Sequence, residues 1–212
     1  MPTLLEGLVD RLDGDLANRR REIVDFRLMV DASSGSRRDL LARACHVMAY
    51  AHWEGFVKLA IEVYLDYVLT RGLNVGSLNF GLQSLAVRTP MRLATEPDRS
   101  IERIADLLKL LDGRTTERFV VSPHDIVQTG NMTAGTLKAL LGCVGLEYLP
   151  AYQTREKFID SVVCGRRHRI AHGEWQPISG DDARAVAGDV LVLCAELNEQ
   201  IQTAAAYETF LL

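Results

Sequence analysis

Residues 37–70 read RRDLLARACHVMAYAHWEGFVKLAIEVYLDYVLT and contain no proline and a single glycine, Gly55. Apolar side chains recur through this stretch at helical spacing, and the Ser/Gly turn at 33–36 before it offers residues that cap helix starts. Arg71 and Gly72 then close it. The stretch predicts one long core helix, and we expect a chain built around it to be all-α.

Further helical segments are predicted on both sides of this helix. Leucines and valines at helical spacing predict an N-terminal helix within 1–32, with Gly14 as the point where it could be interrupted. Residues 71–99 mix Gly, Ser, Asn and two prolines with short apolar pieces, and we expect an irregular excursion with a short helix. Helical period returns in four later stretches, at 100–111, 133–143, 154–172 and 181–207. About six helices with little strand imply a helical bundle in one domain, 1–212.

Composition limits the classes of function. With 48% apolar and 25% charged residues, the chain has the balance of a soluble globular protein. A net charge of only −4 provides no general basic field, so any surface that binds phosphate must be local. No apolar run approaches the roughly 18 residues that span a bilayer. The four cysteines are widely spaced and no secretory signal precedes them, which predicts reduced thiols and a cytoplasmic protein.

One concentrated basic site lies at 164–175, which reads CGRRHRIAHGEW. Three arginines and two histidines fall within seven positions of this segment. Arginine offers a permanently charged fork of donors that matches phosphate oxygens, and histidine gains and loses a proton near neutral pH. Together they are the groups that phosphodiester cleavage without a metal requires.

Helix geometry sets a condition on this site. On a continuous helix Arg167 and His172 would lie about 140° apart, because each residue turns the helix by about 100°. Gly173 favours a helix end and Pro177 prevents continuation, so we expect the helix to end around 170–172. His172 could then turn toward Arg167, or meet the equivalent residues of a second subunit across a two-fold axis.

Two other interpretations of the segment stay open. Arginines and histidines at the end of a helix can simply complement the negative end of its dipole. Cys164, His168 and His172 are spaced by four residues and could form a metal site on one helical face. The interleaved arginines would oppose a divalent cation there, so we expect no metal.

A polar row also runs along the core helix at intervals of four residues, with apolar side chains on either side: His46, Tyr50, Glu54 and Lys58. One explanation is an ordinary solvated face that carries a Glu54–Lys58 ion pair. The other is a stripe that faces a cleft or a dimer interface.

Three segments of the chain resemble segments of a known protein family, and their order and spacing agree as well. They are AYAHWEGFVKLAIEVYLDYV (49–68), IVQTGNMTAGTLKALLGCVGLE (126–147) and FIDSVVCGRRHRIAHGEW (158–175). They resemble the long helix, the Asn-centred segment and the motif helix of the RiboL-PSP-HEPN subgroup, which belongs to the HEPN superfamily (higher eukaryote and prokaryote nucleotide-binding domains). The third segment holds the RxxxxH signature followed by glycine. The resemblance covers roughly residues 42–212.

The resemblance implies a fold and a set of site residues. The fold would be an all-α, HEPN-like bundle with long antiparallel core helices. Arg167 and His172 would be the catalytic pair, and His168 would take the polar position where the subgroup most often has Asn. Arg166 is a reserve candidate, because RxxxxxH spacing is also permitted.

Glu54 and Lys58 match a stretch of the subgroup's long helix and are expected to border the site. The implied activity is endonuclease cleavage of RNA, without a metal or cofactor, by attack of the ribose 2′-OH on the adjacent phosphate. The implied partners are the RNA substrate, a second copy in a homodimer and an antitoxin protein, in a toxin or antiviral-defence role. The alternative is a non-catalytic HEPN module that binds RNA, a nucleotide or a protein partner.

Overall fold

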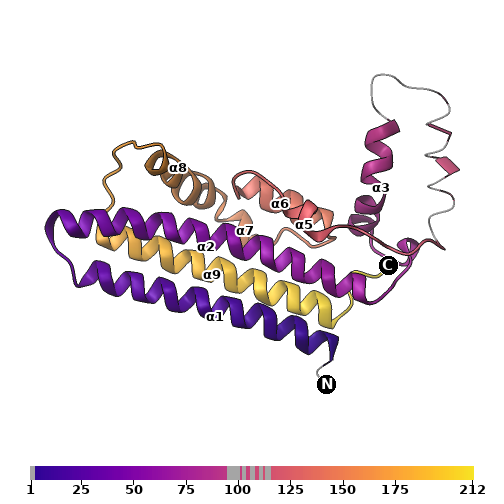
Figure 1. The fold of residues 1–212 in the computed structure, drawn as a ribbon, viewed down its shortest axis with the longest axis horizontal. Helices are drawn as coiled ribbons and strands as arrows, with labels where there is room; N and C mark the ends of the chain where they lie inside the picture. Colours follow the sequence, from indigo (N-terminus) through magenta and orange to yellow (C-terminus); the bar gives the residue numbers. More distant parts are fainter. Residues whose placement is uncertain (1–2, 95–100, 102–103, 106–107, 110–111, 113–115) are drawn as a thin grey trace.

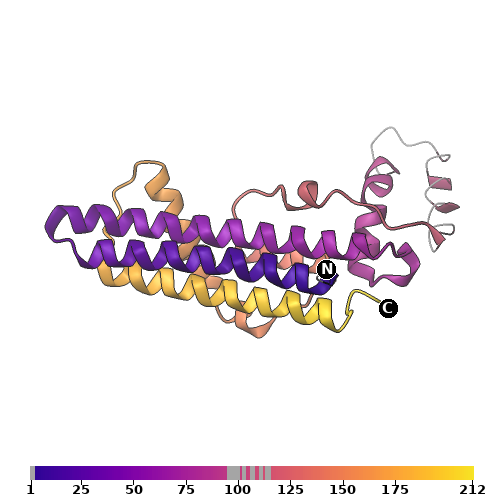
Figure 2. The same cartoon turned by 60° about the horizontal axis from the view of Figure 1, so that its bottom comes forward.

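Figure 1 shows the computed structural model of the chain, which describes residues 3–94, 101, 104–105, 108–109, 112 and 116–212. Three long helices form its body: α1 (Leu4–Asp31), α2 (Gly35–Thr70) and α9 (Gly180–Ala206). Each packs on the other two, and the turned view in Figure 2 again shows them side by side. In both views α1 runs antiparallel to α2 and α9, which run parallel to each other. The prediction of an all-α bundle is confirmed.

Local sequence explains where the first two long helices begin and end. Thr3 and Glu6 form a reciprocal capping box at the start of α1, which continues through Gly14 without the interruption that the glycine suggested. Helix α2 ends at its C-cap, Arg71, and Gly72 follows with a φ of +64°. Buried residues cover more than half of the circumference of α2, as expected for a helix that is covered by several neighbours.

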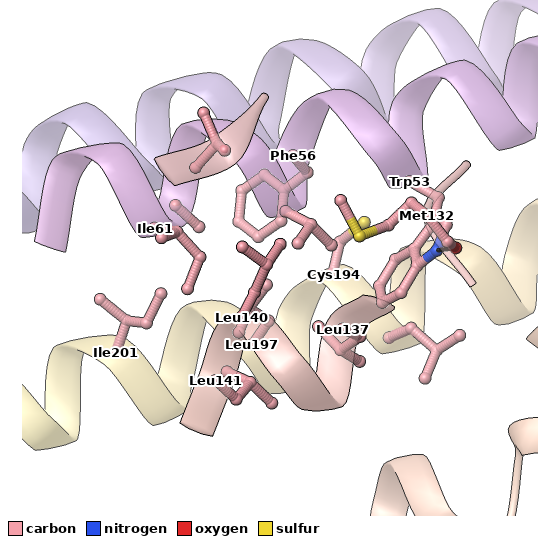
Figure 3. Packing of buried hydrophobic residues seen from close by; sticks show 14 of the residues in the cluster. Trp53, Phe56, Ile61, Met132, Leu137, Leu140, Leu141, Cys194, Leu197 and Ile201 are labelled. Carbon is pink, nitrogen blue, oxygen red and sulfur yellow. Dashed lines mark hydrogen bonds between the residues drawn. The ribbon is translucent and has the colours of Figure 1, made fainter. Parts of the chain in front are cut away.

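Shorter elements pack against α2 and α9: α5 (Pro123–Val127), α6 (Ala134–Cys143), α7 (Pro150–Gln153), η3 (Phe158–Gly165) and α8 (Arg166–Ala171). Figure 3 shows buried leucines of α6 among side chains of both long helices: Leu137, Leu140 and Leu141 with Phe56, Ile61, Leu197 and Ile201. This packing joins the site-bearing elements to the central core.

The region predicted as an irregular excursion, 71–99, is more regular than expected. A short 3-10 turn, η1 (Val75–Ser77), leads to a regular helix, α3 (Phe80–Ala94). Asn79 accepts a hydrogen bond from the Leu82 backbone N–H at 3.1 Å and so caps α3. A Cβ at Gly81 would lie 2.4 Å from the backbone nitrogen of Gly145, so this glycine serves a close approach between segments instead of breaking the helix.

The helix predicted at 100–111 lies largely outside the described residues, and those described within it are helical. Among the helices of the described residues, none combines the length and apolar character needed to cross a membrane.

Candidate active site

The motif segment, predicted as one α-helix over 154–172, contains two helical geometries. Residues Phe158–Gly165 form the π-helix η3, which continues directly into the α-helix α8, Arg166–Ala171. A π-helix has a wider turn than an α-helix and occurs frequently at functional sites. The prediction of a uniform α-helix is therefore wrong at η3. The side chains before Arg166 do not continue the α-helical positions of α8.

Helix α8 ends where the sequence predicted. His172 is its C-cap, and Gly173 follows in the left-handed region with a φ of +79°. The backbone N–H of Glu174 donates to the Arg169 carbonyl at 2.9 Å, and that of Gly173 donates to the Ile170 carbonyl at 3.1 Å. This pair of bonds is a Schellman motif, which favours glycine at this position.

Arg167 is half-buried and is held by two uncharged groups. Its Nη2 donates to Asn131 Oδ1 at 2.7 Å, and its guanidinium lies over the Tyr50 ring, 3.7 Å from the ring centroid. Within the described part of the chain, no carboxylate lies at ion-pairing distance from it, whereas the half-buried Arg19 and Arg184 both pair with aspartates. The guanidinium of Arg167 is therefore oriented without a direct ion pair, although the nearby Glu54 carboxylate interacts with its charge at longer range. A cation held in this way can still bind an anion.

The loop that carries Asn131 is fixed to the core by its neighbour Met132. The Met132 backbone N–H donates to the Tyr50 hydroxyl at 3.1 Å. The Met132 carbonyl accepts from Trp53 Nε1 at 2.9 Å and from Cys164 Sγ at 3.2 Å. Helix α2 and η3 thus hold the loop from two sides, which places the Asn131 amide against Arg167.

The polar row of α2 faces this arrangement and is not a solvated face. His46 is fully buried and Tyr50 is 5% exposed. Burial, followed by the influence of the neighbouring Glu54, raises the pKa of Tyr50 to about 12, so its hydroxyl stays protonated. Glu54 and Lys58 are half-buried and form an ion pair at 2.6 Å. Burial opposes ionisation of Glu54, but hydrogen bonds from Lys58 and Tyr50 outweigh it and lower the pKa of this carboxyl.

His46 connects α2 to the π-helical turn. Its Nε2 lies 3.0 Å from the Val162 carbonyl, which can only accept, so this nitrogen carries the proton and donates. The other ring nitrogen, Nδ1, is buried and has no hydrogen-bond partner among the described residues. Burial lowers the pKa of His46, and the charge of Arg166 lowers it further. His46 is therefore neutral, and it acts as a fixed donor beneath the motif segment.

The remaining predicted residues lie on or near the other side of α8. His168 and His172 are both exposed, with ring centroids 4.3 Å apart, whereas Arg166 is half-buried. Arg167 is turned toward α2 and His172 toward solvent, and no hydrogen bond joins the two in the described part of the chain. One chain therefore does not bring the predicted catalytic pair together, as the angle of about 140° on a helix required.

The metal interpretation of Cys164, His168 and His172 does not fit this geometry. Cys164 is buried and donates to the Met132 carbonyl, away from the exposed histidines. Burial raises the pKa of its thiol to about 12, which disfavours the thiolate that a metal binds. Among the described residues, no three His, Cys, Asp or Glu side chains form a group that could hold a metal ion.

Sequence reasoning missed two residues of the site. Tyr50 belonged to the polar row but was not predicted to contact Arg167. Asn131 lay in the Asn-centred segment but was not chosen as a site residue. The available signal was an Asn between Gly130 and the Thr133 helix cap, in a loop that could present a polar side chain.

Comparisons with known proteins agree with the fold. A model of the MAE_28990-like HEPN family matches residues 8–210. Searches of the curated proteins and of the solved structures gave no match. The matched range includes α2, the loop at Asn131 and all of α8, so it supports the HEPN superfamily without deciding the RiboL-PSP-HEPN subgroup. The chain, matched by this model over nearly its whole length, belongs to the MAE_28990-like HEPN family.

Proposed function

We propose that the protein is an endoribonuclease of HEPN type in which Arg167 and His172 are the catalytic pair. The observation that carries this proposal is the state of Arg167. An amide and an aromatic ring hold its guanidinium, and no described carboxylate pairs with it. A fixed arginine without an ion-pair partner suits a phosphate whose negative charge increases during the reaction.

The reaction uses the ribose 2′-OH of the substrate as its nucleophile. This oxygen loses its proton and attacks the adjacent phosphorus, while the bond from phosphorus to the 5′-oxygen of the next nucleotide breaks and that oxygen takes up a proton. His172 moves a proton in this step, and Arg167 stabilises the charge on the phosphoryl oxygens. The products are a 2′,3′-cyclic phosphate end and a 5′-OH end. DNA lacks the 2′-OH and is not cleaved.

The complete site belongs to a homodimer. Because Arg167 and His172 of one chain diverge, we propose that a two-fold axis near α8 brings Arg167 of one copy close to His172 of the other. The exposed side chains of α8, His168 and Arg169, are available for such a contact.

Four further residues have supporting roles in this proposal. The His168 ring packs against the His172 ring, with the two ring planes tilted by 55°, and restricts the orientation of His172. Arg166 supplies positive charge at the start of α8, where RxxxxxH spacing makes it the reserve candidate. Glu54 interacts with the Tyr50 hydroxyl and forms its ion pair with Lys58, so its carboxylate forms no ion pair with Arg167.

The biological role that we propose is that of a toxin or antiviral-defence effector, restrained by an antitoxin protein where one accompanies it. This role, and the finer placement in the RiboL-PSP-HEPN subgroup, rest on the resemblance of the three segments at 49–68, 126–147 and 158–175.

The direct test is cleavage of an end-labelled RNA oligonucleotide in the presence of EDTA, with the DNA oligonucleotide of the same sequence as substrate control. We expect cleavage of the RNA alone, and cyclic-phosphate ends by mass spectrometry. His172→Ala should abolish cleavage, whereas His124→Ala changes an exposed histidine on α5 and should not. Full activity in His172→Ala would refute the residue assignment. RNA binding without cleavage by the wild-type protein at any pH would favour the non-catalytic module.

A further inference from the structure

An exposed tryptophan follows the motif helix. Trp175 lies three residues after His172 and is 71% exposed, whereas the other tryptophan of the chain, Trp53, is fully buried. The Arg43 guanidinium, from α2, lies over the Trp175 ring at 4.3 Å from the centroid. No carboxylate among the described residues forms an ion pair with Arg43. The pair presents an aromatic face and a cation to solvent beside the proposed active site.

Two open pockets meet at this pair, and we call them together the Trp175 cleft. Each has a volume of about 390 Å³ and is lined by both Arg43 and Trp175. One continues to Asp39 and to the start of α9. The other reaches Ile170 and Gly173 of the turn that ends α8, so it adjoins His172 in the chain.

The chemistry of the cleft fits an unpaired nucleobase. Bases of single-stranded RNA stack on exposed aromatic rings, and an arginine beside the ring adds a cation–π contact. The carboxylates of Asp39 and Glu174 line the two pockets and are exposed. A carboxylate accepts two parallel hydrogen bonds, which the N1–H and N2–H groups of guanine donate side by side.

We infer that the Trp175 cleft binds an unpaired guanine of the RNA next to the phosphate that is cleaved. The inference rests on the proposed ribonuclease function and adds a substrate preference to it. Trp175 provides the stacking surface and Arg43 holds the ring from its other face. Asp39 or Glu174 accepts from the guanine edge. Cleavage therefore occurs next to guanines in single-stranded segments.

Binding is measured first, with the full chain carrying His172→Ala so that the RNA stays intact. The probes are short uridine oligonucleotides that contain one guanine, one inosine or neither. Stacking should quench the emission of the exposed Trp175, while the buried Trp53 keeps its emission. We expect Trp175→Ala to weaken binding of the guanine probe about tenfold, and Trp175→Phe to weaken it less because a ring remains. Inosine lacks the N2 amino group and should bind more weakly than guanine.

Cleavage is measured next, in the otherwise wild-type chain, by mapping cut positions in a mixed-sequence RNA. Trp175→Ala, and Asp39→Asn combined with Glu174→Gln, should reduce the preference for guanine. Phe80→Ala is the matched control, because Phe80 is 77% exposed at the start of α3, at the other end of the molecule from α8 (Figure 1). It should change neither binding nor cut positions.

Unchanged affinity and unchanged cut positions in Trp175→Ala would overturn the inference. A change of oligomeric state in Trp175→Ala, by sedimentation, with unchanged RNA affinity would also overturn it and would assign the cleft to a protein contact. Guanine-dependent quenching of Trp175 in a protein that never cleaves RNA would support the cleft and refute the ribonuclease function, so the two proposals fail separately.

Discussion

Asn131→Ala removes the acceptor that fixes Arg167 while it leaves the arginine in place. The lost bond is short, 2.7 Å, and has a charged donor, a class worth about 1.5–3 kcal/mol when it is buried. Because Asn131 is exposed, we take the lower end of that range. The stacking of Arg167 on Tyr50 remains and still restricts the guanidinium.

If the guanidinium of Arg167 is less well oriented, it stabilises the transition state less. A loss of about 1.4 kcal/mol in this stabilisation corresponds to a tenfold fall in kcat/KM. We therefore expect Asn131→Ala to cleave an end-labelled RNA about tenfold more slowly. The melting temperature should change little, because the backbone of the loop is held through Met132 and not through the Asn131 side chain. Single-turnover cleavage in EDTA, with melting measured on the same preparation, gives both numbers.

Asn131→Asp separates orientation from charge. The new carboxylate would hold Arg167 at least as firmly, but it would compensate the guanidinium and compete with the phosphate. If free charge is what the site needs, Asn131→Asp should cleave more slowly than Asn131→Ala, although its fold is equally stable. Cleavage by Asn131→Asp at the wild-type rate would refute the reasoning that an arginine without an ion-pair partner makes this site.

Other substitutions test how the fold supports the site. His46→Leu leaves the Val162 carbonyl without its donor and should destabilise the protein by about 1–3 kcal/mol in denaturant unfolding. Because burial lowers the pKa of His46, the unfolded chain binds a proton at this residue more readily than the folded chain does. The melting temperature of the wild-type protein should therefore fall as the pH drops below about 6.5. In His46→Leu it should fall less steeply. Gly81→Ala should destabilise by at least about 1–3 kcal/mol, because its Cβ would overlap the Gly145 backbone. Gly14→Ala should instead stabilise α1 by about 0.5–1 kcal/mol, because no described atom beyond the adjacent residues and the nearby helix backbone lies within 4 Å of the added Cβ.

The long helices could be predicted from sequence because their signals are local. The periodicity of 37–70 and the closing residues Arg71 and Gly72 lie within the helix or beside it, and α2 has nearly the predicted bounds. The same local rules predicted an irregular excursion with a short helix over 71–99, where the regular helix α3 lies. Gly81 adds to the loop-like composition of this region, and its role appears only when Gly145 lies against it.

The site could be predicted only in part for a similar reason. Arg167 and His172 lie in one short motif, and the end of α8 follows from Gly173. The partner of Arg167 lies 36 residues earlier in the chain, at Asn131, and its orientation depends on bonds from α2 and η3. The π-helical turn likewise lies against His46, which is 116 residues away from the carbonyl it binds. Contacts of this range leave no periodic signal in the sequence.

The most direct test of the central claim is complementation between two inactive variants, Arg167→Ala and His172→Ala. When the two are mixed and exchange subunits, a mixed dimer contains one copy of each variant. If each site takes Arg167 from one copy and His172 from the other, one of the two sites in this dimer has both residues intact. Random exchange should then restore about a quarter of the wild-type activity in EDTA, because half of the dimers are mixed and each has one complete site. A mixture that stays inactive although mixed dimers have formed would contradict a site shared between two copies, and activity in either variant alone would contradict the catalytic pair.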